Sequence, residues 1–214
     1  MTASPNWPEP ETVSRPDSSV PAGARERLVR ALEKSIEEKG YRNTTVTDIV
    51  RIGRASRRTF YRVFSTKDDV LVALMGDLNR GLIVAMQEAV DTRSPWREQV
   101  AAGIATYFEY IECRPAVYLC SLQEFPYLGE IAEPVVRQGG DAFAELIRSM
   151  TDNEEFRRAG LAPASRLHSM MVQGALDQLV AEILQTSGRI RDGLALAIAS
   201  TTALLSVDAP QPGS

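Results

Sequence analysis

The spacing of apolar residues along the chain first becomes regular at Ala24. Leu28, Leu32 and Ile36 lie four residues apart, so they share one face of a helix. Gly40 follows this stripe, and glycine commonly ends a helix because it adopts the left-handed conformation at no steric cost. The pattern therefore predicts an amphipathic helix that begins near Ala24 and ends at Gly40.

Three more helices are expected before residue 90, each preceded by a capping residue. Thr45 precedes an apolar group and is followed three residues later by Asp48, a pattern that resembles a capping box. Ser56 caps a third, short helix, and Ser65 or Thr66 caps a fourth, which we expect to span residues 67–90. Helices joined by such short turns predict a compact N-terminal bundle.

The rest of the chain predicts longer helices, separated at proline steps or at Gly188. Phe125-Pro126 is one of the expected breaks, because proline removes a backbone donor and clashes with the preceding turn. The expected helices span residues 96–113, 115–123, 130–150, 163–186 and 189–206. We therefore expect an all-α protein with a three-helix domain over residues 23–70 and a C-terminal helical bundle over residues 71–207.

Both ends of the chain lack a hydrophobic period. Residues 1–22 are rich in Pro, Ser and acidic residues, which predicts a disordered arm, and residues 208–214 predict a disordered tail. The first 22 residues contain no apolar stretch of the signal-peptide kind. No run of the sequence approaches the ~18 apolar residues of a membrane span. We expect a cytoplasmic protein with no membrane contact.

Charge is distributed unevenly along the chain. The formal net charge is −4, yet residues 24–72 contain 12 Lys or Arg and 7 Asp or Glu. A basic region on an otherwise acidic protein is the asymmetry expected when one domain meets phosphate groups and the other does not. Composition thus indicates a nucleic-acid contact confined to the N-terminal domain.

The stretch TTVTDIVRIGRASRRTFYRVFSTKDDVLVAL, from Thr44 to Leu74, resembles the DNA-binding signature of the TetR family of repressors. The matching elements are the Gly40-Tyr41 pair, the Thr-x-x-Asp-Ile start of the second helix, the Thr-Phe-Tyr-Arg-x-Phe core of the third, and the Lys-acid-acid start of the fourth. Beyond residue 75 the resemblance is only architectural. It implies an N-terminal helix-turn-helix that binds double-stranded DNA.

The third helix has the polarity that binding in a DNA groove requires. Phe60 and Phe64 form an inner face that packs on the neighbouring helices. The outer face carries Arg57, Arg58, Thr59, Tyr61 and Arg62, and arginine reads guanine through two hydrogen bonds. Further DNA contacts are expected from Arg25, Thr45, Thr47, Arg54, Ser56 and Lys67. The alternative interpretation is a solvated helix face.

The turn between the second and third helices departs from the family pattern. The family usually has Ala-Gly there, whereas this chain has Gly53-Arg54, and Arg58 stands where the family often has glycine. If the turn needs a positive φ, Arg54 is mildly strained, unless Gly53 has taken over the permissive role. These changes bear on which bases are read rather than on groove binding itself.

The last two expected helices are the most apolar part of the chain. A helix that is hydrophobic on nearly all sides must be buried, and a subunit interface offers the room. The resemblance implies a homodimer through these helices, with an interface that includes Leu176, Leu179, Val180, Ile183, Leu196, Ile198 and Leu204. Two-fold pairing would let two short helices read a palindrome.

The resemblance also implies a ligand pocket in the middle of the C-terminal domain. The residues expected there are Trp96, Tyr107, Phe108, Tyr110, Tyr118, Phe125, His168, Met171 and Gln173. The alternative is that each aromatic residue is simply core and that His168 is structural. A mostly apolar and aromatic lining favours a small hydrophobic or aromatic effector.

The predicted function is therefore a dimeric repressor that binds a palindromic operator and is released by an effector. An effector-independent regulator, an activator, or a helical interaction protein with a degenerate helix-turn-helix remain alternatives. We expect no enzyme, because the chain has no Ser-His-Asp or Cys-His set and His168 is its only histidine. Cys113 and Cys120 have no His partners, so we expect no metal site, no cofactor and no disulfide framework.

Overall fold

The computed structural model describes residues 23–186 and 188–207. These residues form ten α-helices and two short 3-10 helices, with no strand among them. The expected all-α fold is confirmed. The predicted arm over residues 1–22 and the predicted tail over residues 208–214 lie outside the described residues.

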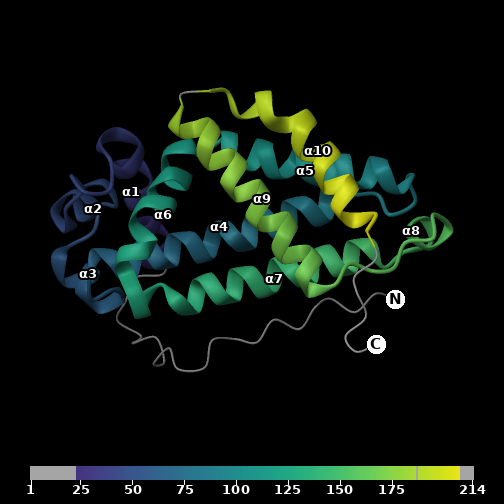
Figure 1. Ribbon diagram of the computed structural model, residues 1–214. Coiled ribbons are helices and arrows are strands. Elements are labelled where there is room, and N and C mark those ends of the chain that lie inside the picture. Colours follow the sequence, from purple (N-terminus) through teal and green to yellow (C-terminus); the bar gives the residue numbers. More distant parts are fainter. Residues whose placement is uncertain (1–22, 187, 208–214) are drawn as a thin grey trace.

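The N-terminal end of the molecule contains three short helices and the start of a long one (Figure 1). The helices are α1 (Ala24–Lys39), α2 (Val46–Ile52), α3 (Arg57–Val63) and α4 (Lys67–Ala89). Each of the last three begins where the sequence places a cap: Thr45, Ser56 and Thr66 accept a hydrogen bond from a backbone N–H of the first turn. The predicted helix-turn-helix is therefore present.

The remaining helices form the C-terminal domain. They are α5 (Trp96–Glu112), α6 (Pro115–Leu128), α7 (Glu133–Thr151), α8 (Glu154–Arg158), α9 (Arg166–Gln185) and α10 (Leu194–Leu205), with 3-10 turns at Gly129–Ile131 and Ile190–Gly193. The short α8 and both 3-10 turns were not expected from the sequence.

The break expected at Phe125-Pro126 is wrong, because α6 continues through Pro126. Proline there removes one backbone hydrogen bond in the last turn of the helix. Phe125 and Leu128, on either side, pack against buried residues of the N-terminal domain. This packing holds the turn in helical form.

Two hydrophobic cores hold the fold together. The first joins α1, α2, α3 and the start of α4, and it also includes Val117 and Cys120 from α6. The second lies among α5, α7, α9 and α10. Because α6 supplies buried side chains to the first core, the C-terminal domain is packed directly on the helix-turn-helix. The domain boundary expected near residue 70 falls inside α4, which extends into both parts.

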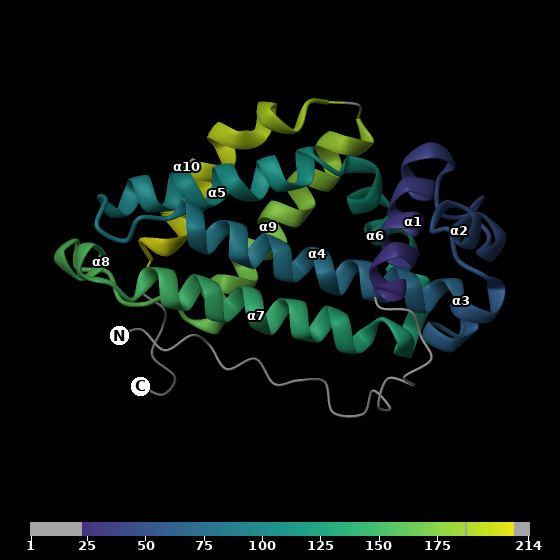
Figure 2. The same cartoon turned by 180° about the vertical axis from the view of Figure 1, so that it is seen from behind.

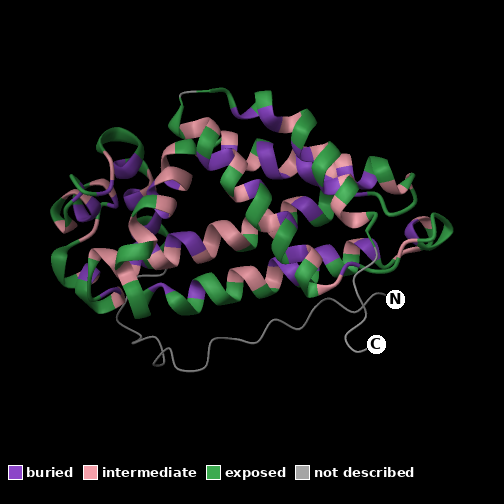
Figure 3. Ribbon diagram, in the orientation of Figure 1, coloured by how far each residue is buried: buried purple, intermediate pink, exposed green. Residues whose placement is uncertain are grey.

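The helices are arranged around α4, which runs from the helix-turn-helix toward the far end of the molecule (Figures 1 and 2). In Figure 2, α5 and α7 flank α4 at the front and α9 lies behind them. The contacts of α9 are with α6, α7 and α10, and α10 also packs on α5. The outward faces of α9 and α10 show a row of exposed positions in Figure 3. Within the described ranges, no helix is long and apolar enough to cross a membrane.

Candidate nucleic-acid interface and ligand cavity

Helix α3 is fixed from behind by its two phenylalanines. Phe60 is fully buried and Phe64 nearly so, and their ring centroids are 6.2 Å apart. Tyr61 lies edge-on to Phe60 at 5.2 Å but leaves 58% of its surface exposed. Arg57 and Arg58 are exposed at the start of the helix. The inner face is thus locked, while the outer face presents positive charge and one aromatic ring to solvent.

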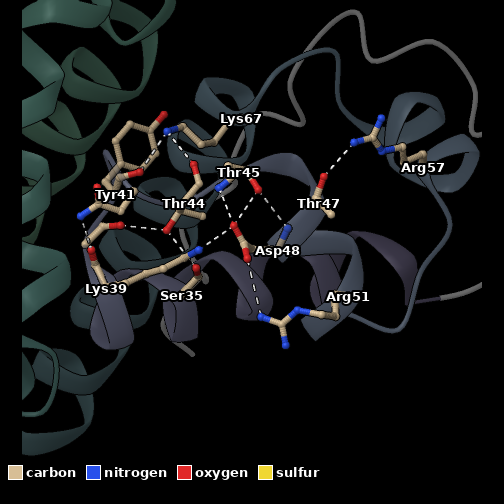
Figure 4. A network of polar contacts seen from close by, with 12 residues as sticks. Ser35, Lys39, Tyr41, Thr44, Thr45, Thr47, Asp48, Arg51, Arg57 and Lys67 are labelled. Atoms are coloured by element: carbon tan, nitrogen blue, oxygen red, sulfur yellow. Dashed lines mark hydrogen bonds and ion pairs between the residues drawn. The ribbon is translucent and has the colours of Figure 1, made fainter.

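The start of α3 is held by hydroxyl groups that we had expected to meet DNA. Ser56 Oγ accepts a 2.9 Å hydrogen bond from the backbone N–H of Thr59, and the hydroxyls of Ser56 and Thr59 lie 2.9 Å apart. Arg57 donates to Thr47 Oγ1 at 2.7 Å (Figure 4). Thr47, on α2, therefore positions a guanidinium group of α3.

The start of α2 is a network of three charged or polar side chains (Figure 4). Thr45 and Asp48 form the expected capping box, with Thr45 N to Asp48 Oδ2 at 2.9 Å. The Thr45 hydroxyl also donates to this carboxylate at 2.6 Å, and Lys39 Nζ lies 2.6 Å from it. The ion pair with Lys39 and the hydrogen bonds from Thr45 hold the pKa of Asp48 well below its usual range. The side chain of Thr45 is thus engaged as a cap.

Lys67 lies against the turn between α1 and α2 rather than reaching outward. Its Nζ donates to the carbonyl oxygens of Tyr41 at 2.9 Å and Thr44 at 3.0 Å, and it sits 3.9 Å from the centre of the Tyr41 ring (Figure 4). Burial lowers the pKa of Lys67. An ammonium group has three donors, so two are used within the protein. The ring of Tyr41 is anchored in turn by its hydroxyl, which donates to Asp68.

In the turn between α2 and α3, the left-handed backbone conformation belongs to Arg54 and not to Gly53. Arg54 has φ +48°, the only positive φ of a non-glycine residue in the described part of the chain, whereas Gly53 has φ −75°. Gly53 has a different role: a Cβ there would lie 3.0 Å from the carbonyl oxygen of Ile49 and 3.2 Å from that of Arg27. Gly53 permits close packing against α1, and Arg54 carries the left-handed conformation.

Arg25, expected at a phosphate, is paired within the protein. Its guanidinium donates to both carboxylate oxygens of Asp77 on α4, at 2.9 and 3.2 Å. Arg80 donates to the same carboxylate. Arg25 thus links the start of α1 to α4.

A cavity of about 620 Å³ lies in the C-terminal domain next to the helix-turn-helix. Helices α4, α5, α6, α7 and α9 all contribute to its wall. Five of the residues expected in a pocket line it: Tyr107, Tyr110, Tyr118, Phe125 and Gln173. Most of the other lining residues are aliphatic or glycine, so the cavity is largely apolar.

Four of the expected pocket residues lie elsewhere. Trp96 packs on Phe156 at 5.5 Å, and Phe108 is 1% exposed in the second core. His168 is in the capping box at the start of α9, where it serves the helix terminus. Met171 is 57% exposed on the outside of α9. The pocket assignment of these four is corrected: Phe108 is core, Trp96 is partly buried against the second core, His168 is a cap and Met171 is on the surface.

Asp177 is the cavity residue that sequence reasoning missed. Its Oδ1 accepts hydrogen bonds from the hydroxyls of Tyr107 at 2.5 Å and Tyr118 at 3.0 Å. The pKa of Asp177 is raised, because the effect of burial outweighs that of the two hydrogen bonds, which lower it. Burial also raises the pKa of Tyr107 and of Tyr118. The signal was available, because Asp177 follows Leu176 directly inside the apolar stripe of its helix.

Arg114 lies at the edge of this cavity and connects it to the helix-turn-helix. Its Nε donates to Glu33 on α1 at 2.8 Å, and its guanidinium lies 5.2 Å from the centre of the Tyr110 ring. A second ion pair, Arg42 to Glu124 at 2.8 Å, joins the turn after α1 to α6. The N-cap residue of α6 and the helix itself are therefore both tied to the N-terminal domain.

The stripe chosen from sequence for a dimer interface mostly faces inward. Leu176 and Val180 are 2% and 0% exposed in the second core, so they do not form a surface. Leu179, Ile198 and Leu204 are partly buried against the same core, and Ile183 packs beside Gly193. Leu196 alone of the set is well exposed, at 60%.

The apolar residues that do reach the surface of α9 were missed. Leu167, Met170 and Met171 are 68%, 56% and 57% exposed. They lie on the first turns of α9, and the exposed positions Gly174 and Ala175 follow them. The inward stripe has the stronger periodicity, which is why the sequence favours it over this exposed face.

The fold and this site define a helix-turn-helix protein with a helical C-terminal domain that encloses a cavity. Residues 28–74 match the family model described as bacterial regulatory proteins, tetR family. The resemblance to the TetR family is thereby confirmed over these residues. A sequence search against curated proteins gave no match.

Solved structures of similar fold include several transcriptional regulators. A putative TetR-family regulator from Syntrophomonas wolfei has a TM-score of 0.70 at 14% identity, over 88% of this chain and 98% of that one. FadR from Bacillus subtilis, in complex with stearoyl-CoA, has a TM-score of 0.65 at 18% identity, over 85% of this chain and 97% of that one. FadR from Thermus thermophilus, in complex with lauroyl-CoA, has a TM-score of 0.64 at 18% identity, over 89% and 100%. At these identities the likeness shows the fold.

Proposed function

We propose that this protein is a dimeric transcriptional repressor that binds a palindromic operator and is released when a small hydrophobic molecule occupies the cavity. The observation that carries the proposal is the outer face of α3. Arg57, Arg58 and Tyr61 are exposed on a short helix whose opposite face is locked into the core by Phe60. A helix built in this way is suited to enter the major groove.

The DNA contacts are divided between reading bases and fixing register. Arg57 and Arg58 are the candidates for guanine, since a guanidinium forms two hydrogen bonds with its major-groove edge. Tyr61 and Arg54 suit phosphate groups on either side. Lys67 and Thr45 act mainly inside the protein, so any phosphate contact from them adds to a structural role.

Dimerisation would place two copies of α3 one helical turn of DNA apart. The exposed apolar residues Leu167, Met170 and Leu196 on α9 and α10 suit such an interface, because burying them removes apolar surface from water. This face replaces the inward stripe that the sequence suggested.

Release by an effector would act through α6. This helix lines the cavity and supplies Val117 and Cys120 to the N-terminal core. Its N-cap residue Arg114 pairs with Glu33 on α1, and its Glu124 pairs with Arg42 in the turn after α1. A molecule that moves α6 therefore moves the helix-turn-helix, and only a small change in the spacing of the two α3 helices is needed to weaken binding. The two FadR structures contain acyl-CoA molecules, which supports a ligand with a hydrophobic body.

The test is a gel-shift experiment with the DNA upstream of the gene for this protein, at two salt concentrations. Specific binding should weaken steeply with salt, because phosphate contacts release counterions. The double variant R57A/R58A should lose specific binding by about tenfold or more, whereas the matched control R137A/R157A, exposed arginines of the C-terminal domain, should not. Equal binding by the α3 variant and its control would support a degenerate helix-turn-helix instead.

A further inference from the structure

The cavity contains one partly buried carboxylate, that of Asp177, and only one of its two oxygens accepts a hydrogen bond from the described part of the chain. Tyr107 and Tyr118 both donate to Oδ1 of Asp177. The other oxygen, Oδ2, receives no hydrogen bond from any residue in the described ranges, and no ion pair there involves Asp177. Since Asp177 lines the cavity, this oxygen is the group that a ligand can meet.

The other charges around the cavity do not neutralise Asp177. Arg114 is the only lining residue with a positive charge among the described residues, and it is paired with Glu33. Glu133 adds a second carboxylate at the rim, 3.5 Å from Arg137. The balance of charge around the cavity is therefore negative, and an opposite charge close to a partly buried carboxylate stabilises its ionised form.

Aromatic rings stand close to this carboxylate. Tyr107 is next to Phe143 at 6.4 Å between ring centres, and Tyr110 and Tyr118 complete the aromatic part of the lining. The face of an aromatic ring attracts a positive charge, most strongly where water is excluded. Carboxylate and rings together match a cation that has a hydrophobic body.

We propose that the cavity binds an organic cation, an amine or quaternary ammonium compound whose positive group lies against Oδ2 of Asp177 and whose apolar part fills the space between α4, α6 and α7. This inference rests on the proposed function, in which the cavity is the effector site, and it names the chemical class of the effector. An anionic or purely neutral molecule of the same size would leave the carboxylate of Asp177 without a positive partner.

The experiment compares three probes that share a ten-carbon chain: decyltrimethylammonium, decanol and decanoate, each below its solubility limit and micelle concentration. Binding to the purified full-length protein is measured by isothermal titration calorimetry. The wild-type protein should bind the ammonium compound about tenfold or more tightly than the other two. The variant D177N keeps the size of the side chain and an oxygen for the two tyrosines, and it should lose that preference while binding decanol as before. The control D192N changes an exposed aspartate that does not line the cavity, so it should keep the preference.

Two results would overturn the inference: wild-type protein that binds decanol or decanoate as tightly as the ammonium compound, and folded D177N that keeps the preference. If D177N does not fold, the wild-type comparison of the three probes decides. Gel shifts run in parallel separate this inference from the proposed function. Ammonium binding by protein that shifts no DNA supports the cation site and counts against the repressor. Release of DNA by decanoate alone supports the repressor and overturns the cation site.

Discussion

Arg114, at the edge of the cavity, lies 2.8 Å from Glu33, on the first helix of the DNA-binding domain. The side chains are 37% and 23% exposed, so solvent screens the pair and its stability contribution should be modest. Its position matters more than its strength. Arg114 links the wall of the cavity to the first helix of the N-terminal domain by an ion pair.

The coupling of this pair can be measured in a double-mutant cycle with E33Q and R114Q. We expect the free energies of unfolding to be non-additive by about 0.5–1 kcal/mol, because each single change already removes the interaction. The matched cycle with E37Q, an exposed glutamate on the same helix, should be additive. Additive values for the Glu33 cycle would show that the pair is not formed in solution.

Arg57 and Thr47 should act on DNA as one unit. The variant T47V removes the oxygen that accepts a hydrogen bond from Arg57, so operator affinity should fall by part of the loss seen in R57A. The double variant R57A/T47V should bind about as well as R57A, because residues that share one interaction are not additive. Gel-shift titrations of the three variants check this. Independent, additive losses would indicate that Thr47 contacts DNA separately.

Replacing Arg54 with glycine should stabilise the protein while it weakens DNA binding. The left-handed conformation costs a residue with a Cβ about 1–2 kcal/mol, and the greater freedom of glycine in the unfolded chain offsets part of the gain. We expect the free energy of unfolding of R54G to rise by about 0.5–1 kcal/mol in urea titrations. If Arg54 meets a phosphate, the slope of log affinity against log salt falls by about 0.9. A destabilised R54G would contradict the conformational argument.

The neighbouring variant G53A should act in the opposite direction. A Cβ at this position would lie 3.0 Å and 3.2 Å from two backbone oxygens, which have no flexible end to move away. We expect a loss of about 1–3 kcal/mol in the free energy of unfolding, the usual range for overpacking. The same urea titration serves both variants, and a G53A protein of wild-type stability would show that the two helices separate easily.

The exposed face of α9 can be tested through the oligomeric state. The double variant L167E/M170E places charges where the proposed dimer needs apolar contact, so light scattering should report a monomer that keeps its helical circular dichroism. The control V84E changes an apolar residue of α4 that is 50% exposed and should leave the dimer intact. A dimer that survives L167E/M170E would place the interface elsewhere.

The N-terminal domain could be predicted closely from sequence because local signals determine it. Thr45, Ser56 and Thr66 cap their helices as expected, and Phe60 is buried as its spacing with Phe64 required. The roles of polar groups were harder. Lys67 has the charge and position of a phosphate ligand, yet the fold directs it to two carbonyl oxygens across the domain, and that contact depends on tertiary packing.

In the C-terminal domain the helices could be predicted from sequence, but not which face of each helix is buried and which is exposed. Leu176 and Leu196 both looked like interface residues, and only packing between distant helices reveals that the first is core and the second surface. The cavity shows the same limit. Aromatic composition pointed to Tyr107 and Tyr118, but Asp177, whose carboxylate joins them, lies 70 and 59 residues further along the chain, beyond the reach of any local pattern.

Val117 and Cys120 extend from α6 into the core of the helix-turn-helix domain. This domain is therefore not structurally independent of the rest of the chain. A chimaera that joins residues 23–75 to another sensor domain would leave a gap in the N-terminal core where Val117 and Cys120 lie, unless the new partner brings its own apolar side chains to fill it. Joining the C-terminal domain to the helix-turn-helix of another protein meets the same condition, because the apolar side chains of α6 then need a matching core. A functional exchange of domains between such proteins therefore requires that α6 be transferred together with the helix-turn-helix domain.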